Sequence, residues 1–397
     1  MNTKPNLGIK RVLNVSLKGL VLNLFLLASL QTNAAQKHVS TSGNDSWPGT
    51  ASQPWRTVRY AGETALAGDT VYIHGGTYHD LLVVRNSGTE TNPIVFTSFP
   101  GELAIIDGTG LELYAEMNWI AGLRRWHGAV DMYNVNWIVI RGLRVQNMTL
   151  GNGIYFQRAE NIVIENNVID NTYNSGIGTW VDNVKPDPND NTKQMYPPDT
   201  AAWRFSKNII IRNNEVTRAV NGGWSECISL EGVDGFEITG NYVHDNFHGN
   251  LANFWGGGGE NIDCKTGTRN GIIANNIVHG NRRVGIYIDA WNAHVRNIDI
   301  YNNLCYNLSL GAAIAISNED GGKVSNIRVY NNILYNTKDG VILPNPNKRP
   351  FEPVENSRRF FNNTIFHCGY NVQYPGGYGF KMDNPDAKKR EDLQQYL

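Results

Sequence analysis

Residues 161–168, NIVIENNV, recur with small changes along much of the chain. Related stretches are 208–216 (NIIIRNNEV), 235–243 (GFEITGNYV), 270–278 (NGIIANNIV), 297–305 (NIDIYNNLC) and 326–334 (NIRVYNNIL), with 360–365 (FFNNTI) as a last degenerate copy. Most spacings are about 25 to 31 residues, and self-similarity at such a period indicates a repeat architecture. Each copy holds alternating apolar residues broken by Asn and Gly, with no room for a crossover helix. The pattern predicts an all-β fold, a parallel β-helix with one coil per copy.

The recurrent Asn of each copy has a structural explanation. An Asn at the same turn of every coil can stack its side-chain amide on the next and satisfy backbone polar groups at each corner. We therefore expect an asparagine ladder there rather than a ligand-binding role.

Residues 1–35 have the features of a signal peptide. A basic region precedes the apolar stretch 19–30 (GLVLNLFLLASL), which is too short to span a bilayer, and small residues around Ala34 offer a cleavage site. An uncleaved N-terminal anchor is the alternative. We expect a secreted or periplasmic protein with no membrane attachment after cleavage.

The rest of the chain divides by its pattern. Residues 36–135 are expected to form an N-terminal cap and the first coils, including a helix near residues 54–66 that buries Trp55, Val58, Ala61 and Ala65. Residues 136–370 are expected to form the remaining coils, with insertions at 172–207 and 246–260, and residues 371–397 a C-terminal tail or cap. Long loops on a rigid coil commonly carry function.

Composition narrows the class of ligand. The formal net charge is -1, so nothing in the total charge favours nucleic acid or an anionic membrane as a partner. An acidic ligand would need local basic groups or a metal. The chain has 4 cysteines, at 227, 264, 305 and 368. We expect them to stay unpaired, because Cys264 and Cys305 fall at inward strand positions where Cys acts as a small hydrophobe.

Residues 259–265, GENIDCK, bring two kinds of charge together in one short strand. Alignment of the repeats places Ile177, Ile228, Ile262, Ile286, Ile314 and Val341 in one inward row, and Leu230, Cys264, Ile288, Ile316 and Leu343 in the next. The residues between them face outward. One outward row reads Ser229, Asp263, Tyr287, Ala315, and its neighbour reads Glu231, Lys265, Asp289, Ser317.

This alignment predicts a cluster of carboxylates around one ammonium. Lys265 should lie between Glu231 and Asp289, with Asp263, Glu226 and Glu260 nearby. Like charges repel, so a cation is expected to relieve them: Lys265, an arginine or a bound metal, for which oxygen ligands favour Ca²⁺. A surface ladder of salt bridges is the alternative.

Other side chains near this strand suit an acidic sugar. Trp180, Trp224, Trp255 and Trp291 could stack on sugar faces, or could simply anchor loops. Arg282 and Arg283 lie in the turn before Tyr287 and could meet substrate carboxylates.

The signal peptide, the N-terminal module and the Asn-Asn coils together resemble secreted right-handed β-helix polysaccharide lyases. Residues 260–266, ENIDCKT, are similar to a strand of the alginate lyase and chondroitinase B family. That resemblance implies Ca²⁺ binding by Glu260 and a base role for Lys265. The stretch GGEN at 258–261 also looks like family-nine pectate lyases, which implies Ca²⁺ binding by Asp263.

The chain departs from both families in part of the site. The alginate lyase family has a catalytic arginine one coil later, where the alignment places Asp289, so Arg282 or Arg283 would substitute from the turn. The paired aspartates that complete the family-nine calcium site are absent, and Arg283 and Val284 fall near their positions.

We therefore predict a monomeric lyase of an acidic polysaccharide that acts by β-elimination. Its expected residues are Lys265, Arg283 and Arg282 for catalysis, Asp289, Tyr287, Trp291, Trp224 and Glu231 for substrate binding, and Glu260, Asp263 and Glu226 for Ca²⁺. A lyase removes the proton at C5 of a uronic acid once its carboxylate is neutralised.

Three alternatives stay open. A glycoside hydrolase could use Glu231 and Asp289, which two strand spacings would place about 9.6 Å apart, near the upper end of the range for inverting carboxylates. A uronan C5-epimerase would share the first chemical step. A non-catalytic carbohydrate-binding β-helix would turn over nothing.

Overall fold

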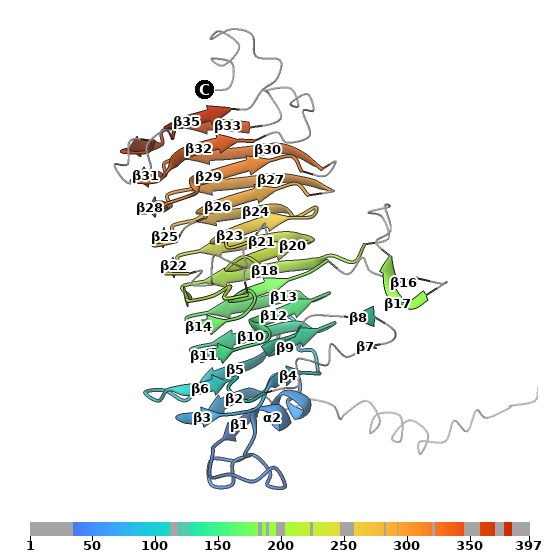
Figure 1. Ribbon diagram of the computed structural model, residues 1–397. Helices are drawn as coiled ribbons and strands as arrows, with labels where there is room; N and C mark the ends of the chain where they lie inside the picture. The colour runs from blue at the N-terminus through green and yellow to red at the C-terminus, as the bar shows by residue number, and fades with distance from the viewer. Residues whose placement is uncertain are drawn as a thin grey trace, which may run out of the picture. The chain divides into compact units, whose positions relative to one another are not determined.

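The computed structural model describes residues 35–111, 119–120, 123–124, 127–181, 185–187, 190–195, 203–222, 225–246, 258–281, 283–291, 293–319, 322–344, 358–369 and 377–382. Their strands form three long parallel sheets, of 11, 10 and 10 strands. Each coil adds one strand to each sheet in turn, and successive coils stack on one another (Figure 1). The predicted parallel β-helix is confirmed.

The three sheets are named A, B and C here. Sheet A contains β1 (Gln36–Val39), β2 (Thr70–Ile73), β5 (Ile94–Ser98), β10 (Asn136–Arg141), β13 (Glu160–Glu165), β18 (Ser206–Arg212), β21 (Val233–Thr239), β24 (Arg269–Ala274), β27 (His294–Tyr301), β30 (Lys323–Tyr330) and β33 (Arg358–Phe361). Sheet B contains β3 (Gly76–Tyr78), β6 (Ala104–Asp107), β11 (Arg144–Met148), β14 (Val168–Thr172), β19 (Glu215–Thr217), β22 (Tyr242–His244), β25 (Ile277–His279), β28 (Leu304–Tyr306), β31 (Ile333–Tyr335) and β34 (Thr364–Phe366). Sheet C contains β4 (Leu82–Val84), β9 (Gly128–Tyr133), β12 (Asn152–Gln157), β15 (Ile177–Thr179), β20 (Ile228–Glu231), β23 (Ile262–Lys265), β26 (Ile286–Asp289), β29 (Ala312–Ser317), β32 (Asp339–Leu343) and β35 (Phe380–Met382).

The core follows the apolar alternation of the repeats. In sheet C, Ile228, Ile262, Ile286 and Ile314 lie in register on consecutive strands, and each is fully buried. Because side chains alternate across a strand, the residues between them face the outside of the coil. The register expected from the sequence is therefore confirmed along this wall.

The two residues of each Asn-Asn pair have different structural roles. The first Asn of a pair has a left-handed backbone, as at Asn275 with φ 58°. The second Asn is buried and builds the ladder: the Asn276 amide donates to the Ile238 carbonyl at 2.9 Å and to the Asn303 side-chain oxygen at 2.9 Å. The same pattern runs through Asn167, Asn214, Asn241, Asn276, Asn303, Asn332 and Asn363. The predicted ladder is confirmed.

The N-terminal region contributes a short helix and the first coils. Helix α2 (Val58–Thr64) begins after Thr57, whose side chain accepts a hydrogen bond from the Tyr60 amide. The side chains of Trp55, Val58, Ala61 and Ala65 are buried, as expected. The helix is shorter than the predicted range of 54–66, and Trp55 precedes it.

Some expected insertions and tails contain strands of the coil. Strand β15 lies inside the range 172–207, so the residues that leave the coil follow it and include an antiparallel pair, β16 (Lys185–Asp187) and β17 (Asp190–Met195). A second antiparallel pair, β7 (Trp119–Ile120) and β8 (Leu123–Arg124), lies within the first coils. Strand β35 lies inside the expected tail and pairs with β32. The expected signal peptide, most of the 246–260 insertion and residues 383–397 lie outside the described residues.

The four cysteines are buried and unpaired, as predicted. Within the described ranges, no helix has both the length and the apolar character needed to cross a membrane.

Candidate active site

Strand β23 places the charged residues of the site on the outer face of sheet C. Backbone pairing sets Lys265 opposite Glu231 of β20 on one side and opposite Asp289 of β26 on the other. The next outward row sets Asp263 between Ser229 and Tyr287. Both outward rows expected from the sequence are thus confirmed.

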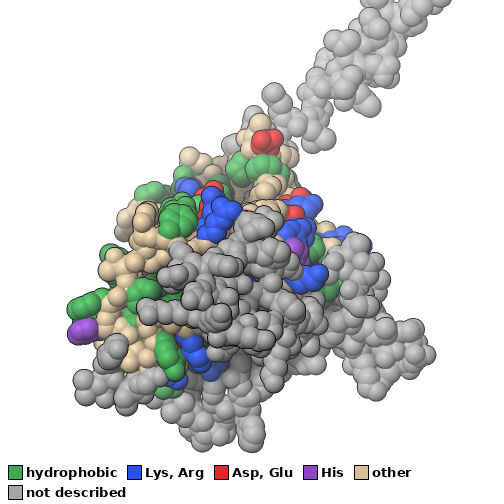
Figure 2. All heavy atoms as spheres, turned by 90° about the horizontal axis from the view of Figure 1, so that it is seen from above, with side chains coloured by type: hydrophobic (Ala, Val, Ile, Leu, Met, Phe, Trp, Pro, Cys, Tyr) green, Lys and Arg blue, Asp and Glu red, His purple; other side chains and the backbone are tan. Residues whose placement is uncertain are grey.

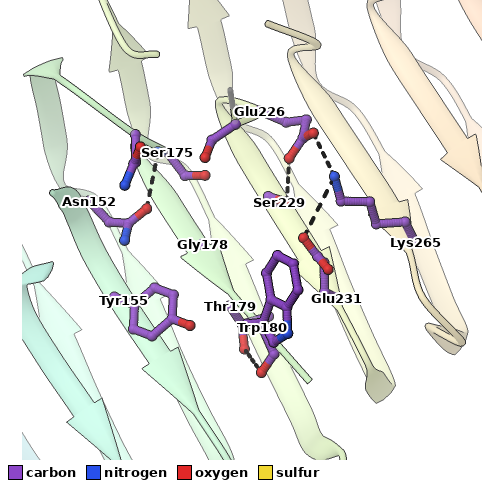
Figure 3. Close-up of a pocket in the computed structure, with 12 residues that line it drawn as sticks. Asn152, Tyr155, Ser175, Gly178, Thr179, Trp180, Glu226, Ser229, Glu231 and Lys265 are labelled. Atoms are coloured by element: carbon purple, nitrogen blue, oxygen red, sulfur yellow. Dashed lines mark hydrogen bonds and ion pairs between the residues drawn. The ribbon is translucent and has the colours of Figure 1, made fainter. Parts of the chain in front are cut away.

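Three carboxylates surround the Lys265 ammonium. Its Nζ lies 2.6 Å from Glu226 Oε1, 3.4 Å from Asp263 Oδ2 and 3.6 Å from Glu231 Oε1. Glu226 comes from the turn before β20 and also accepts a hydrogen bond from the Ser229 hydroxyl at 2.8 Å. Figure 3 shows Glu226 and Glu231 both directed at the lysine. The shortest of these contacts is with Glu226, a residue outside the strand.

The second cation of the cluster is Arg283, which precedes β26. Its Nη2 lies 3.2 Å from Glu260 Oε1. Arg283 therefore sits beside one of the carboxylates expected to bind Ca²⁺. Arg282, the other predicted catalytic arginine, lies outside the described residues.

Asp289 and Tyr287 form a second group on β26. The Tyr287 hydroxyl donates a hydrogen bond to Glu319, which the sequence patterns did not single out. Asp289 is 8% exposed, and its Oδ1 is buried without a hydrogen-bond partner. Trp291 follows β26 and is half-buried, whereas Trp224 and Trp255 lie outside the described residues.

Burial gives the carboxyl groups of the cluster unusual acidities. It raises the pKa of Glu231 to about 7 despite the opposing ammonium of Lys265. Burial, with Glu319 adding, raises the pKa of Asp289 to about 8. Burial also raises the pKa of Asp263 well above its usual range. A raised pKa is the property that a carboxyl group needs to act as a general acid near neutral pH.

Lys265 is held in its charged form in this state. Burial acts to lower its pKa, but the carboxylates of Glu226, Glu231 and Asp263 outweigh burial and hold the pKa well above its usual range. A base role for Lys265 thus requires a ligand that offsets these carboxylates.

The three residues expected to bind Ca²⁺ supply suitable atoms but no preassembled site. Glu260 Oε2 and Asp263 Oδ1 are buried oxygens without a hydrogen-bond partner, as a hard cation would require. Glu226 directs Oε1 at Lys265 and Oε2 at Ser229. Among the described residues, no group of three or more His, Cys, Asp or Glu side chains is arranged to hold a metal ion.

A pocket of about 110 Å³ opens beside Lys265 on sheet C. Glu226, Glu231 and Lys265 line it, whereas Asp289, Tyr287, Trp291, Glu260, Asp263 and Arg283 do not. The remaining lining residues are Asn152, Tyr155, Asn174, Ser175, Gly178, Thr179, Trp180, Ser225 and Ser229. Most of these come from β12 and β15, which lie three and two coils before β23, and from the turn that precedes β15.

One outward row could have revealed part of this pocket from the sequence. Tyr155 and Gly178 precede Ser229 and Asp263 in their row. Asn174 and Ser175 lie in a turn whose side chains have no period, so alternation gave no signal for them.

Comparison with known proteins agrees with the fold. Residues 37–195 match a family model described as a Pel9A-like right-handed β-helix region, and residues 128–293 match the general right-handed β-helix region. These matches confirm the expected resemblance to right-handed β-helix proteins of the Pel9A type, whereas the stretch 258–261, on which the family-nine resemblance was based, lies outside the Pel9A-like range and inside the general one.

Two curated proteins align with part of the chain. The uncharacterized protein YwoF of Bacillus subtilis (strain 168) is 32% identical over 217 residues, which are 53% of this chain and 41% of YwoF. Pectate lyase PEL9 of Emericella nidulans is 39% identical over 80 residues, which are 20% of each chain. This chain therefore spans less than half the length of either relative.

A solved structure of XylC with xylose has the same architecture, with a TM-score of 0.52 and 14% identity over 83% of this chain and 75% of XylC. At this identity the likeness concerns the fold alone. The stacked coils, the three parallel sheets and the two family models agree. The chain is a right-handed parallel β-helix protein, and its residues 37–195 match the Pel9A-like family model.

Proposed function

We propose that this protein is a secreted polysaccharide lyase that cleaves a uronic-acid polymer by β-elimination. The observation that carries the proposal is the position of Lys265 at the edge of an outward-facing pocket, within 3.6 Å of three carboxylates. A surface ladder of salt bridges does not explain such burial, since Glu226, Glu231 and Asp263 are each less than 5% exposed. The match to a Pel9A-like region and the alignment with a pectate lyase support the same class.

The chain's own residues supply a proton path and a charge partner. Lys265 is the proposed base that takes the C5 proton, and Glu226 at 2.6 Å is placed to accept the proton that Lys265 must first lose. Arg283 is the proposed partner of the uronate carboxylate. Its side chain is 31% exposed and lies beside Glu260, just before β23. The carboxyl of Glu231 is placed on the pocket side of Lys265, where it can return a proton to the leaving oxygen.

Calcium is part of this proposal. Glu260, Asp263 and Glu226 would hold it, and the unpartnered oxygens of Glu260 and Asp263 are the observation in favour. When bound, a calcium ion would neutralise the uronate and lower the pKa of the neighbouring ammonium.

A glycoside hydrolase is the second candidate, and the acidity of two carboxyl groups favours it. Glu231 and Asp289 lie on strands either side of β23, and both have a raised pKa. Two strand spacings give a separation of about 9.6 Å between them. That is near the upper end of the range found for inverting hydrolases.

The product of the reaction separates these classes. The protein would be incubated with polygalacturonate, alginate, glucuronan and glycosaminoglycans, with and without a chelator, while absorbance near 235 nm and reducing ends are followed. We expect one polymer to give both signals together. Reducing ends without ultraviolet absorbance would replace the lyase by a hydrolase. Inverted C5 configuration without fragments would replace it by an epimerase.

A further inference from the structure

We propose that the pocket beside Lys265 is a subsite for an uncharged sugar residue, so that the polymer carries neutral sugars next to its uronic acids. This inference rests on the proposed function, because that function makes the neighbouring sugar a uronic acid. The pocket's preference for a neutral over an acidic sugar can be measured separately. It concerns the part of the pocket formed by β12 and β15, which the catalytic residues do not occupy.

The pocket exists because one outward position has no side chain. Gly178 lies in the outward row between Tyr155 and Ser229. A β-carbon at Gly178 would lie 2.9 Å from the Ser175 β-carbon and 3.5 Å from Asn152 Oδ1, and would fill the floor. Figure 3 shows Tyr155 on one side of Gly178 and the Glu226, Glu231 and Lys265 group on the other.

The walls of the pocket combine apolar rings with neutral polar groups. Tyr155 and Trp180 supply the rings, and Trp180 is held in place by packing against the buried cluster of Val181, Trp203 and Ala293. A sugar presents apolar C–H faces together with hydroxyl groups, and rigid aromatic walls with a few polar groups suit both.

A side-chain amide lines the pocket at Asn174. Asn174 is 4% exposed, and no described residue makes a hydrogen bond with its side-chain amide. An amide that faces a pocket can bond to water or to a ligand there. The Asn174 amide can both donate to and accept from sugar hydroxyls, which makes it a natural partner for a neutral residue.

The charges of the pocket disfavour an acidic sugar. Among the described residues that line it, Lys265 is the one cation, and Glu226 and Glu231 are both within 3.6 Å of it. A uronate placed there would meet the acidic side chains of Glu226 and Glu231 and an ammonium that Glu226 already pairs at 2.6 Å. Like charges in a partly buried site repel strongly, so the neutral form of the same sugar should bind better.

Binding of matched glycosides tests the pocket without any turnover. Methyl galactoside and methyl galacturonoside differ in one oxidised carbon, and methyl xyloside and methyl rhamnoside extend the neutral set. Affinities of the full chain would be measured by calorimetry and by saturation-transfer NMR in calcium-containing buffer. We expect a neutral glycoside to bind about tenfold more tightly than the galacturonoside, a difference that corresponds to about 1.4 kcal/mol.

Substitutions locate the bound sugar. Trp180→Ala and Asn174→Ala should each weaken the neutral glycoside several-fold, and Trp47→Ala, which removes an exposed tryptophan near the N-terminus, should leave it unchanged. Melting temperatures show whether each variant is folded. Equal or tighter binding of the galacturonoside, or unchanged affinity in both folded pocket variants, would overturn the inference, as would no binding of any glycoside.

The polymer assay distinguishes this inference from the proposed function. Elimination at 235 nm would be compared on polygalacturonate, which is all uronate, and on hyaluronan and the rhamnogalacturonan backbone, in which uronic and uncharged sugars alternate. A higher kcat/KM on an alternating polymer supports the inference. A higher value on polygalacturonate overturns it and leaves the lyase intact. If neutral glycosides bind but no polymer undergoes elimination, the neutral-sugar subsite is supported and the proposed lyase activity is contradicted.

Discussion

Lys265 is the residue on which the chemistry of this protein depends, because it is the cation nearest to three buried carboxylates. We expect Lys265→Ala to lower kcat by about 10² to 10⁴, the usual contribution of a positioned base. The initial rate of absorbance increase at 235 nm measures this loss.

Lys207→Ala is the matched control, since Lys207 pairs with Glu160 on the exposed face of sheet A. Its rate should equal that of the natural protein. A Lys265→Ala variant that folds and keeps its full rate would remove Lys265 from the mechanism.

Glu231 should make stability depend on pH. Its carboxyl pKa is raised from 4.5 to about 7 in the folded protein. Between these values the folded protein keeps a proton that the unfolded chain has released, so the free energy of unfolding falls as pH rises. The shift corresponds to about 3 kcal/mol over the full interval. Denaturant unfolding in the presence of a chelator, at several pH values across this window, would show it.

The variant Glu231→Gln carries no titrating proton and should show a shallower slope. Asp289 retains its own raised pKa, so some slope should remain. The exposed residue Glu237 of β21 gives the control Glu237→Gln, which should leave the slope unchanged. Parallel slopes for Glu231→Gln and the natural protein would show that Glu231 is not the titrating group.

Alternation of apolar residues was sufficient to predict which side chains share a row, but not which atoms meet. The rows through Asp263 and Lys265 follow from strand pairing alone. The short contact from Lys265 to Glu226 depends on a turn, and turns have no period from which a direction can be inferred. Glu319 was missed for the same reason, since it follows β29 in a loop.

At the scale of the structural element, the Asn-Asn corner joins each coil to the next. The buried Asn276 donates to Ile238 and Asn303 and accepts from the backbone and side chain of Asn241. Asn276→Ala removes these bonds and leaves the Asn241 donors unsatisfied. We expect the free energy of unfolding to fall by about 3 kcal/mol, measured by denaturant titration.

The neighbouring residue provides a contrast within the same corner. Asn275 is exposed and has a φ of 58°, a conformation that glycine adopts without strain. Asn275→Gly should change stability by less than about 0.5 kcal/mol. A similar loss in both variants would contradict the division of roles between the two positions.

The elements themselves were the most predictable part of the fold, since Asn, Gly and alternating apolar residues recur at each coil. Their limits were less predictable where the repeat is interrupted. Strand β15 falls in a stretch rich in Asn and Gly, and its three residues, Ile177–Thr179, are too few to show alternation. The sequence of β35 does not show the repeat pattern, and its strand is defined by its pairing with β32.

At the scale of the whole molecule, the described surface mixes basic and acidic side chains, whereas the candidate active site buries several carboxyl groups. Seen from the C-terminal end, basic and acidic side chains lie beside one another on the described surface (Figure 2). This agrees with a formal net charge of -1. Among the described residues, the buried carboxylate oxygens without a hydrogen-bond partner belong to Asp80, Glu260, Asp263 and Asp289, and the last three lie on or next to β23 and β26.

Calcium bound by Glu226, Glu260 and Asp263 should therefore stabilise the whole β-helix. Binding to the folded protein alone would raise the free energy of unfolding by about 2.7 kcal/mol at a concentration one hundred times Kd. Differential scanning calorimetry with calcium or chelator would record a higher Tm with calcium. Asp263→Asn should abolish the increase, and Asp299→Asn, which alters an acid paired with Arg328 on sheet A, should preserve it. An unchanged Tm in the natural protein would end the calcium proposal.

The stacking of coils has a consequence for how such a protein measures its substrate. Parallel strands advance by about 4.8 Å from one coil to the next, which is close to the length of one monosaccharide in an extended chain. If a glycan lies along sheet C, each successive monosaccharide contacts the next strand of the sheet. Loss or duplication of a single coil would then displace the recognised pattern by one monomer, and the wall could acquire a new preference without any change in its chemistry.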